Sequence, residues 1–146
     1  MKIEGHYDFQ APRAKVWEAL LDPKLLANAM PGCEKLEPQG PDEYKAIMKI
    51  GIAAVKGTFE GKVKLSNLEP PTRYTMAVEG SGAPGFVRGT ASLGLSDVEG
   101  GTRVSYDADV QIGGLIAGVG QRLMGGVSKM MLDQFFSKMS EQLTGK

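Results

Sequence analysis

Apolar and polar residues alternate through most of the chain between residues 44 and 112, and this alternation limits the fold more than any other feature. In the clearest stretch every second residue from Val104 to Ile112 is apolar or aromatic, and the residues between them are polar. Side chains of a β-strand point alternately to its two faces, so this period predicts strands with one buried face. The same pattern predicts strands at 3–9, 44–50, 55–65, 74–78 and 87–95.

A helical period replaces the alternation from about Leu115 to Leu143. Apolar residues recur there three or four positions apart, which predicts one long helix with an apolar stripe. Interior glycines destabilise helices, so Gly125-Gly126 predicts a kink. Two shorter helical patterns follow the first strand, one after Pro12 and one begun by Asp22-Pro23.

A sheet with one polar face must cover its apolar face, and the long helix is the available cover. The chain of 146 residues has the length of one domain. We therefore predict a single α+β domain over residues 1–146. Its curved antiparallel sheet wraps around a long C-terminal helix, and two short helices follow the first strand.

The charge balance and the residue counts exclude several classes of function. Seventeen Lys and Arg balance 17 Asp and Glu, so the basic excess of a nucleic-acid-binding protein is missing. One Cys and one His exclude an intramolecular disulfide and a multi-histidine metal site. No apolar run approaches the roughly 20 residues of a transmembrane helix, and the first residues lack the apolar segment of a secretion signal. We expect a cytoplasmic protein without a metal or cofactor.

Few side chains are suited to catalysis. His6 lies on the polar face of the first predicted strand, where pairing with neighbouring surface residues is its expected role. Cys33 has no histidine other than His6 to activate it. Asp107 and Asp109 share the outward face of the last predicted strand, where solvent weakens the pKa tuning that acid–base catalysis needs. We expect no catalytic residue among them.

Small residues interrupt the large ones on the predicted inward face of the sheet, and the facing helix is rich in methionine. Gly57, Gly61, Gly89 and Ala91 are inward in this pattern. Small residues beneath a helix permit either close backbone contact or a space for a ligand, and methionines adapt to irregular apolar shapes. Glycine bulges that curve the sheet are a structural alternative. We expect an apolar pocket between the sheet and the long helix.

The predicted pocket lining consists of Trp17, Met30, Met48, Phe59, Met76, Val78, Val87, Gly89, Tyr106, Val110, Met124, Val127, Met131 and Phe135. The candidates for contact with a polar headgroup are Trp17, Tyr106 and the loop backbone amides near residues 82–85. Gly89→Leu is expected to fill the space and block binding.

Four segments resemble the carbon monoxide dehydrogenase G-subunit family, which belongs to the polyketide cyclase/START-like, Bet v 1-like superfamily. They are 30–34 (MPGCE), 56–63 (KGTFEGKV), 74–82 (YTMAVEGSG) and 113–136. The resemblance implies a helix-grip fold with a hydrophobic cavity between sheet and helix. It also implies an accessory role in which the protein recruits molybdenum-containing CO dehydrogenases to the membrane and handles respiratory quinone.

These observations favour a non-catalytic accessory domain that binds a quinone or lipid-like molecule and supports a molybdenum hydroxylase of the CO dehydrogenase type. One alternative is a small cyclase or hydrolase that uses Tyr7, Tyr106 or His6 as acid–base groups. Another is a protein-interaction module with a filled core. Binding is favoured over catalysis because tyrosines are the only ionisable side chains at the inward positions. Their ordinary pKa of about 10 suits acid–base catalysis poorly.

The same interpretation places the protein in the cytoplasm and allows a peripheral position at the inner face of the cell membrane. Without its partner the chain is expected to bind membrane surfaces weakly. The residues that would make this contact are Leu115, Ile116, Val119 and Leu123.

Overall fold

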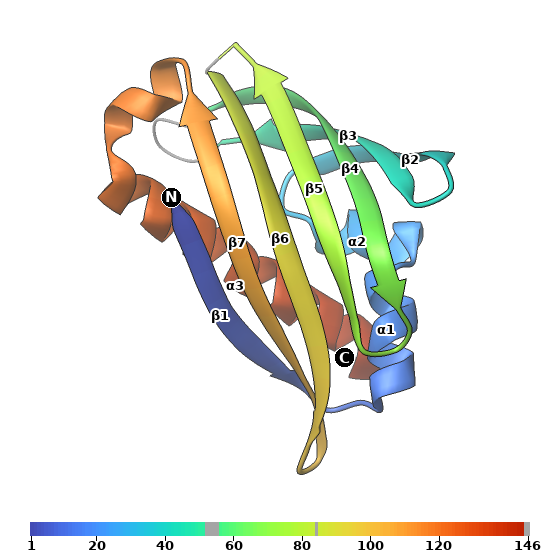
Figure 1. The fold of residues 1–146 in the computed structure, drawn as a ribbon. Coiled ribbons are helices and arrows are strands. Elements are labelled where there is room, and N and C mark those ends of the chain that lie inside the picture. The colour runs from blue at the N-terminus through green and yellow to red at the C-terminus, as the bar shows by residue number, and fades with distance from the viewer. Residues whose placement is uncertain (52–55, 84, 145–146) are drawn as a thin grey trace.

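The computed structural model describes residues 1–51, 56–83 and 85–144, and Figure 1 shows a curved sheet with helix α3 crossing one of its faces. The strands are β1 (Lys2–Phe9), β2 (Cys33–Gly40), β3 (Glu43–Ile50), β4 (Gly57–Glu69), β5 (Arg73–Gly82), β6 (Gly85–Val98) and β7 (Gly101–Gly113). The helices are α1 (Arg13–Leu20), α2 (Pro23–Ala29), the 3-10 helix η2 (Leu115–Val119) and α3 (Gln121–Thr144). Val55, the first residue of one predicted strand, lies outside the described residues.

The seven strands form one antiparallel sheet in the order β1-β7-β6-β5-β4-β3-β2. From β2 to β7 each strand pairs with the next one along the chain, while α1 and α2 carry the chain between the two edge strands β1 and β2. In Figure 1 these two short helices lie near the C-terminal end of α3. The predicted α+β architecture is confirmed.

The two short helices form where local sequence signals predict them. Pro12 caps α1 in an extended conformation. The side chain of Asp22 caps α2 and accepts a hydrogen bond from the backbone N–H of Lys24 at 2.9 Å. Pro23 follows at the first helical position, where the missing N–H of proline costs nothing because that donor has no intrahelical partner.

The prediction of one continuous helix from Leu115 is wrong at its start. Residues 115–119 form η2, and Gly120 separates η2 from α3 with a φ of 91°, which favours glycine. Gly125 and Gly126 instead lie within the continuous run of α3. The break therefore falls five residues earlier than the glycine pair that predicted it.

Strand β2 is absent from the sequence prediction. Its residues do not alternate, it contains Pro38, and its pairing with β3 shifts register twice. Proline is tolerated in edge strands because one side of such a strand needs no hydrogen-bond donor. An edge strand that is mostly exposed on both faces carries little of the pattern from which strands are recognised.

Candidate functional site

Helix α3 packs against the concave face of the sheet through two separate buried clusters. The larger cluster joins α1, one end of the sheet and the C-terminal half of α3 around Phe9, Val16, Val104, Phe136 and Met139. The smaller cluster joins the other end of the sheet to η2 and the N-terminal half of α3. It consists of Ile50, Phe59, Ile116, Met124 and Val127.

Between the two clusters lies a stretch of the concave face that we call the central band. It consists of Ile3, Val78, Gly80, Gly89, Ala108 and Val110, all on the face of the sheet that turns toward α3. Its four apolar side chains belong to neither cluster, and all six residues are only half-buried. In the same sheet Leu95 is 3% exposed and Val104 is fully buried. The central band is therefore an apolar floor that the helix covers incompletely.

A hollow of about 430 Å³ lies at one end of the central band. Its lining is Met1, Phe86, Val110, Gln111, Ile112, Ala117, Gly120 and Met124. Sites for small molecules commonly measure about 300–1,000 Å³ and are mostly apolar. The hollow and the central band together form the candidate binding site.

Most of the predicted pocket residues divide between this site and the two clusters that flank it. Val110 and Met124 line the hollow, and Val78 and Gly89 lie in the central band. Phe59 and Val127 belong to the smaller cluster, with Met48, Val87 and Met131 packed against it. Met76, Tyr106 and Phe135 pack against the larger cluster.

The two remaining predicted pocket residues lie outside the hollow and the central band. Trp17 is only 7% exposed and packs edge-on against Tyr74, with the ring centroids 5.4 Å apart. This position makes Trp17 part of the larger cluster, to which none of the central-band side chains belongs. Met30 follows α2 and lines a second hollow with Lys129 and Met130 of α3, outside both clusters.

The expectation that Gly89 leaves space for a ligand is also wrong. A Cβ atom there would lie 2.8 Å from the carbonyl oxygen of Asp109 and 3.2 Å from a methyl group of Val110. The backbone of β7 therefore occupies the place of a side chain, and Gly89→Leu would disturb the sheet as well as fill the site. Ala108 in the central band is a better position for added volume.

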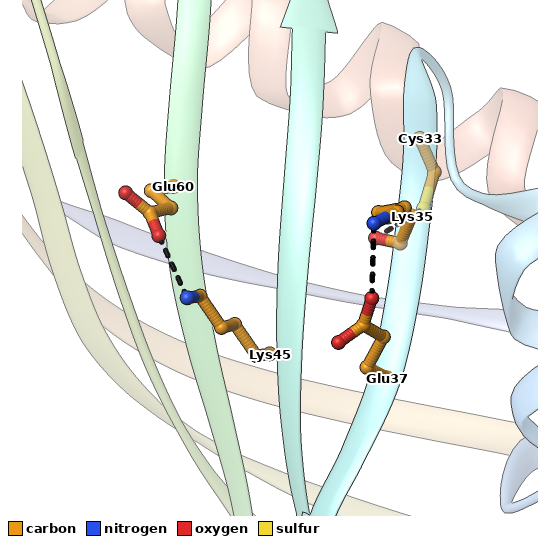
Figure 2. A network of polar contacts seen from close by, with 5 residues as sticks. All are labelled: Cys33, Lys35, Glu37, Lys45 and Glu60. Carbon is orange, nitrogen blue, oxygen red and sulfur yellow. Dashed lines mark hydrogen bonds and ion pairs between the residues drawn. The ribbon is translucent and has the colours of Figure 1, made fainter.

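The polar residues considered for catalysis lie away from the central band. His6 and Cys33 are on β1 and β2, the opposite edges of the sheet, so they form no Cys–His pair. The thiol of Cys33 hydrogen-bonds the carbonyl oxygen of Lys35 at 3.4 Å, and burial raises its pKa. Figure 2 shows this thiol next to Lys35, which pairs with Glu37 on the same strand, while the ion pair Lys45–Glu60 lies farther away, between β3 and β4. A thiol whose pKa is raised is a weak nucleophile.

Charged side chains do not enter the buried core of the described residues, where Thr102 is the one buried polar residue. Its hydroxyl donates a hydrogen bond to the carbonyl oxygen of Ala11 at 2.8 Å. Within residues 1–51, 56–83 and 85–144, no group of three His, Cys, Asp or Glu side chains could hold a metal ion. The part of the chain described also contains no helix long and apolar enough to cross a membrane.

The sequence pattern misses several residues of the hollow. It assigns Ala117 and Gly120 to one long helix, although they belong to η2 and to the break after it. Alternation with Val87 turns Phe86 outward, and the structure agrees, because the ring covers its cross-strand partner Gly113. The same ring lies next to Arg88. The pattern does not show that this outward ring also borders the hollow. The glycines at 114 and 120, which flank five residues, are the signal that could have indicated a separate short helix.

The expected membrane-contact residues divide between surface and core. Leu115 is 80% exposed and Leu123 is also exposed, whereas Ile116 is fully buried in the smaller cluster. The side chain of Val119 lies outside the described part of the structure. Ile116 therefore anchors η2 to the core, and its inclusion in a membrane contact is wrong.

A curved seven-stranded antiparallel sheet against a long C-terminal helix is the helix-grip fold of Bet v 1-like proteins. Ara h 8.0201 has this arrangement, with a TM-score of 0.72 and 15% identity over 100% of this chain and 99% of its own. A conserved protein from Geobacillus kaustophilus is more similar, with a TM-score of 0.96 and 34% identity over 99% of this chain and 96% of its own.

The family is shown by a match that covers nearly the whole chain. The model of the CoxG family, described as the G subunit of carbon monoxide dehydrogenase, matches residues 5–144. The chain therefore belongs to the carbon monoxide dehydrogenase CoxG family. No curated protein sequence matches it.

Proposed function

We propose that this protein is a non-catalytic accessory domain that binds an apolar molecule, quinone or lipid-like, on the central band beneath α3. The observation that carries the proposal is the central band itself, because Val78, Ala108 and Val110 stay half-buried under a helix. A ligand tail that covers this floor gains about 25 cal/mol for each Å² of apolar surface removed from water.

The partner is inferred from the family. Its description names a component of carbon monoxide dehydrogenase, and we propose that the domain supports a molybdenum hydroxylase of this type and its link to the membrane. Leu115 and Leu123 are exposed at the end of the molecule that contains the hollow. They would allow weak contact with a membrane surface while the partner supplies most of the affinity.

The absence of catalysis is part of the proposal. An acid–base mechanism in an apolar site needs ionisable groups that converge on the substrate. His6 is exposed on the far side of β1, and burial raises the pKa values of Tyr106 and Tyr44. These phenols stay protonated at physiological pH and provide no base. A screen of ester and polyketide substrates should show no turnover, and turnover abolished by Tyr106→Phe would overturn this part of the proposal.

The binding proposal is tested with one substitution placed on each face of the sheet. Ala108→Leu adds volume to the central band, whereas Ala77→Leu adds the same volume on the exposed, outward face of β5. We expect 2-decyl-1,4-benzoquinone to bind the wild type and Ala77→Leu with similar Kd values and to bind Ala108→Leu at least tenfold more weakly. Equal Kd values for the two folded variants would contradict the proposed site.

A further inference from the structure

The phenol of Tyr106 lies across the backbone of the edge strand β1. Tyr106 pairs with Gly5, and a Cβ atom on Gly5 would lie 2.6 Å from the Tyr106 hydroxyl oxygen and 2.9 Å from the ring carbon that carries it. An aromatic side chain that covers a cross-strand glycine in this way is a recognised device of sheet edges. Any larger residue at position 5 would displace the hydroxyl group.

The ring of Tyr106 is held by the aromatic side chains beneath α3. It stacks on Phe136 of α3 with ring centroids 5.5 Å apart and an interplanar angle of 23°. Phe136 also stacks on Tyr7 of β1, at 5.4 Å and 13°. Because Phe136 is buried in the larger cluster, it keeps the Tyr106 ring in one orientation.

The hydroxyl of Tyr106 has no hydrogen-bond partner among the residues that the structure describes. The comparable phenol of Tyr44, near the opposite edge of the sheet, donates to the carbonyl oxygen of Leu21 at 3.3 Å. The Tyr106 hydroxyl therefore keeps some contact with solvent, because no buried side-chain oxygen of the described residues lacks a hydrogen-bond partner. A ligand that displaces this water would offer the hydroxyl a new partner. Burial, and to a lesser extent the nearby carboxylate of Asp133, raises the pKa of Tyr106 and keeps its proton in place.

The position of this donor relates it to the candidate site. Ala108 and Val110 follow Tyr106 on the same face of β7, so the central band runs from the hollow toward the phenol. Val110 and Tyr106 are four positions apart in the strand, which corresponds to about 13 Å. A molecule that lies on the band from the hollow would bring its inner end to the Tyr106 hydroxyl.

We propose that the Tyr106 hydroxyl, placed over Gly5, donates a hydrogen bond to the ligand and thereby selects apolar molecules that carry a carbonyl, ether or hydroxyl oxygen. This inference rests on the proposed function, because it needs a ligand on the central band. It makes Tyr106 a specificity-determining residue and gives Gly5 the role of leaving room for its hydroxyl.

The test compares two probes of similar shape, 2-decyl-1,4-benzoquinone and decylbenzene, by displacement of 1-anilinonaphthalene-8-sulfonate. We expect the wild type to prefer the quinone three- to tenfold, as one hydrogen bond allows. Tyr106→Phe should abolish this preference while retaining affinity for decylbenzene. Gly5→Ala should reduce the preference in the same way with the phenol still present. Tyr44→Phe is the matched control, because its hydroxyl already has a partner, and it should keep the preference.

The outcomes separate the two proposals. An unchanged preference for the quinone in both Tyr106→Phe and Gly5→Ala, with both probes bound, would overturn the role of Tyr106 and leave the binding site standing. Failure of both probes to bind the wild type would overturn the proposed function and this inference with it.

Discussion

Phe136 is the residue whose removal should cost the most stability. It is 3% exposed and contacts four aromatic rings, those of Tyr7, Phe9, Tyr106 and Phe135. Truncation of a buried phenylalanine to alanine costs about 3–5 kcal/mol, and we expect the upper half of this range because aromatic pairs add about 0.5–1.5 kcal/mol each. Phe135→Ala is the control, because Phe135 is only half-buried and makes one of these ring contacts.

Urea denaturation followed by circular dichroism measures this difference. Phe136→Ala should lose about 4 kcal/mol of unfolding free energy, and Phe135→Ala about half as much. With an unfolding entropy of about 2.1 cal/mol/K per residue, a loss of about 4 kcal/mol in a chain of this length corresponds to a Tm lower by about 13 °C. A cost below about 1.5 kcal/mol for Phe136→Ala, or equal costs for the two variants, would refute the view that α3 is held mainly through Phe136.

Three further predictions concern local features. Ile116→Ala should cost about 2–4 kcal/mol in urea denaturation because Ile116 is fully buried; Leu115→Ala should stay within about 0.5 kcal/mol, and similar costs for the two would contradict the anchoring of η2. Asp22→Ala should lose about 1 kcal/mol with the cap of α2, and an unchanged urea midpoint would count against that cap. Two hydrogen bonds from Arg103 to Asp8 lower the pKa of Asp8. The contribution of these two bonds to the stability of the folded protein is therefore complete at neutral pH, and it is lost as the pH falls through a folded-state pKa of Asp8 below 3.8. NMR titration should show the pKa of Asp8 rising in Arg103→Gln, and an unchanged pKa would contradict the pairing.

Local chemistry and alternation account for the parts of the fold that can be predicted from sequence. Asp22 and Pro23 act within one turn, so their effect on α2 follows directly from their order in the chain. The strand from Val104 to Ile112 alternates because only one of its faces is covered by α3. Strand β2 escapes prediction for the opposite reason, since most of its residues, including Pro38, are exposed on both faces.

Tertiary packing determines what the sequence pattern cannot show. Residues 115–119 are apolar enough to extend the helix, but Ile116 packs into the smaller cluster and the chain breaks at Gly120. Trp17 and Val78 are equally plausible pocket residues by composition. Only the position of α1 places Trp17 in the larger cluster, and only the register of the strands places Val78 on the central band.

The hollows of the structure make the location of the ligand the central question. The hollow beside the central band measures about 430 Å³, whereas the one beside Met30 and Met130, on another side of α3, measures about 800 Å³. Volume alone would favour the second. The half-buried apolar floor favours the first, because burial of that floor adds hydrophobic free energy.

Methyl NMR during titration with 2-decyl-1,4-benzoquinone tests the location of the ligand most directly. We expect saturable shift changes at the methyl groups of Val78, Ala108, Val110 and Met124, with no change at Ala77 on the outward face of β5. Shift changes confined to Met30 and Met130, or no saturable change at any methyl group, would contradict binding on the central band beneath α3.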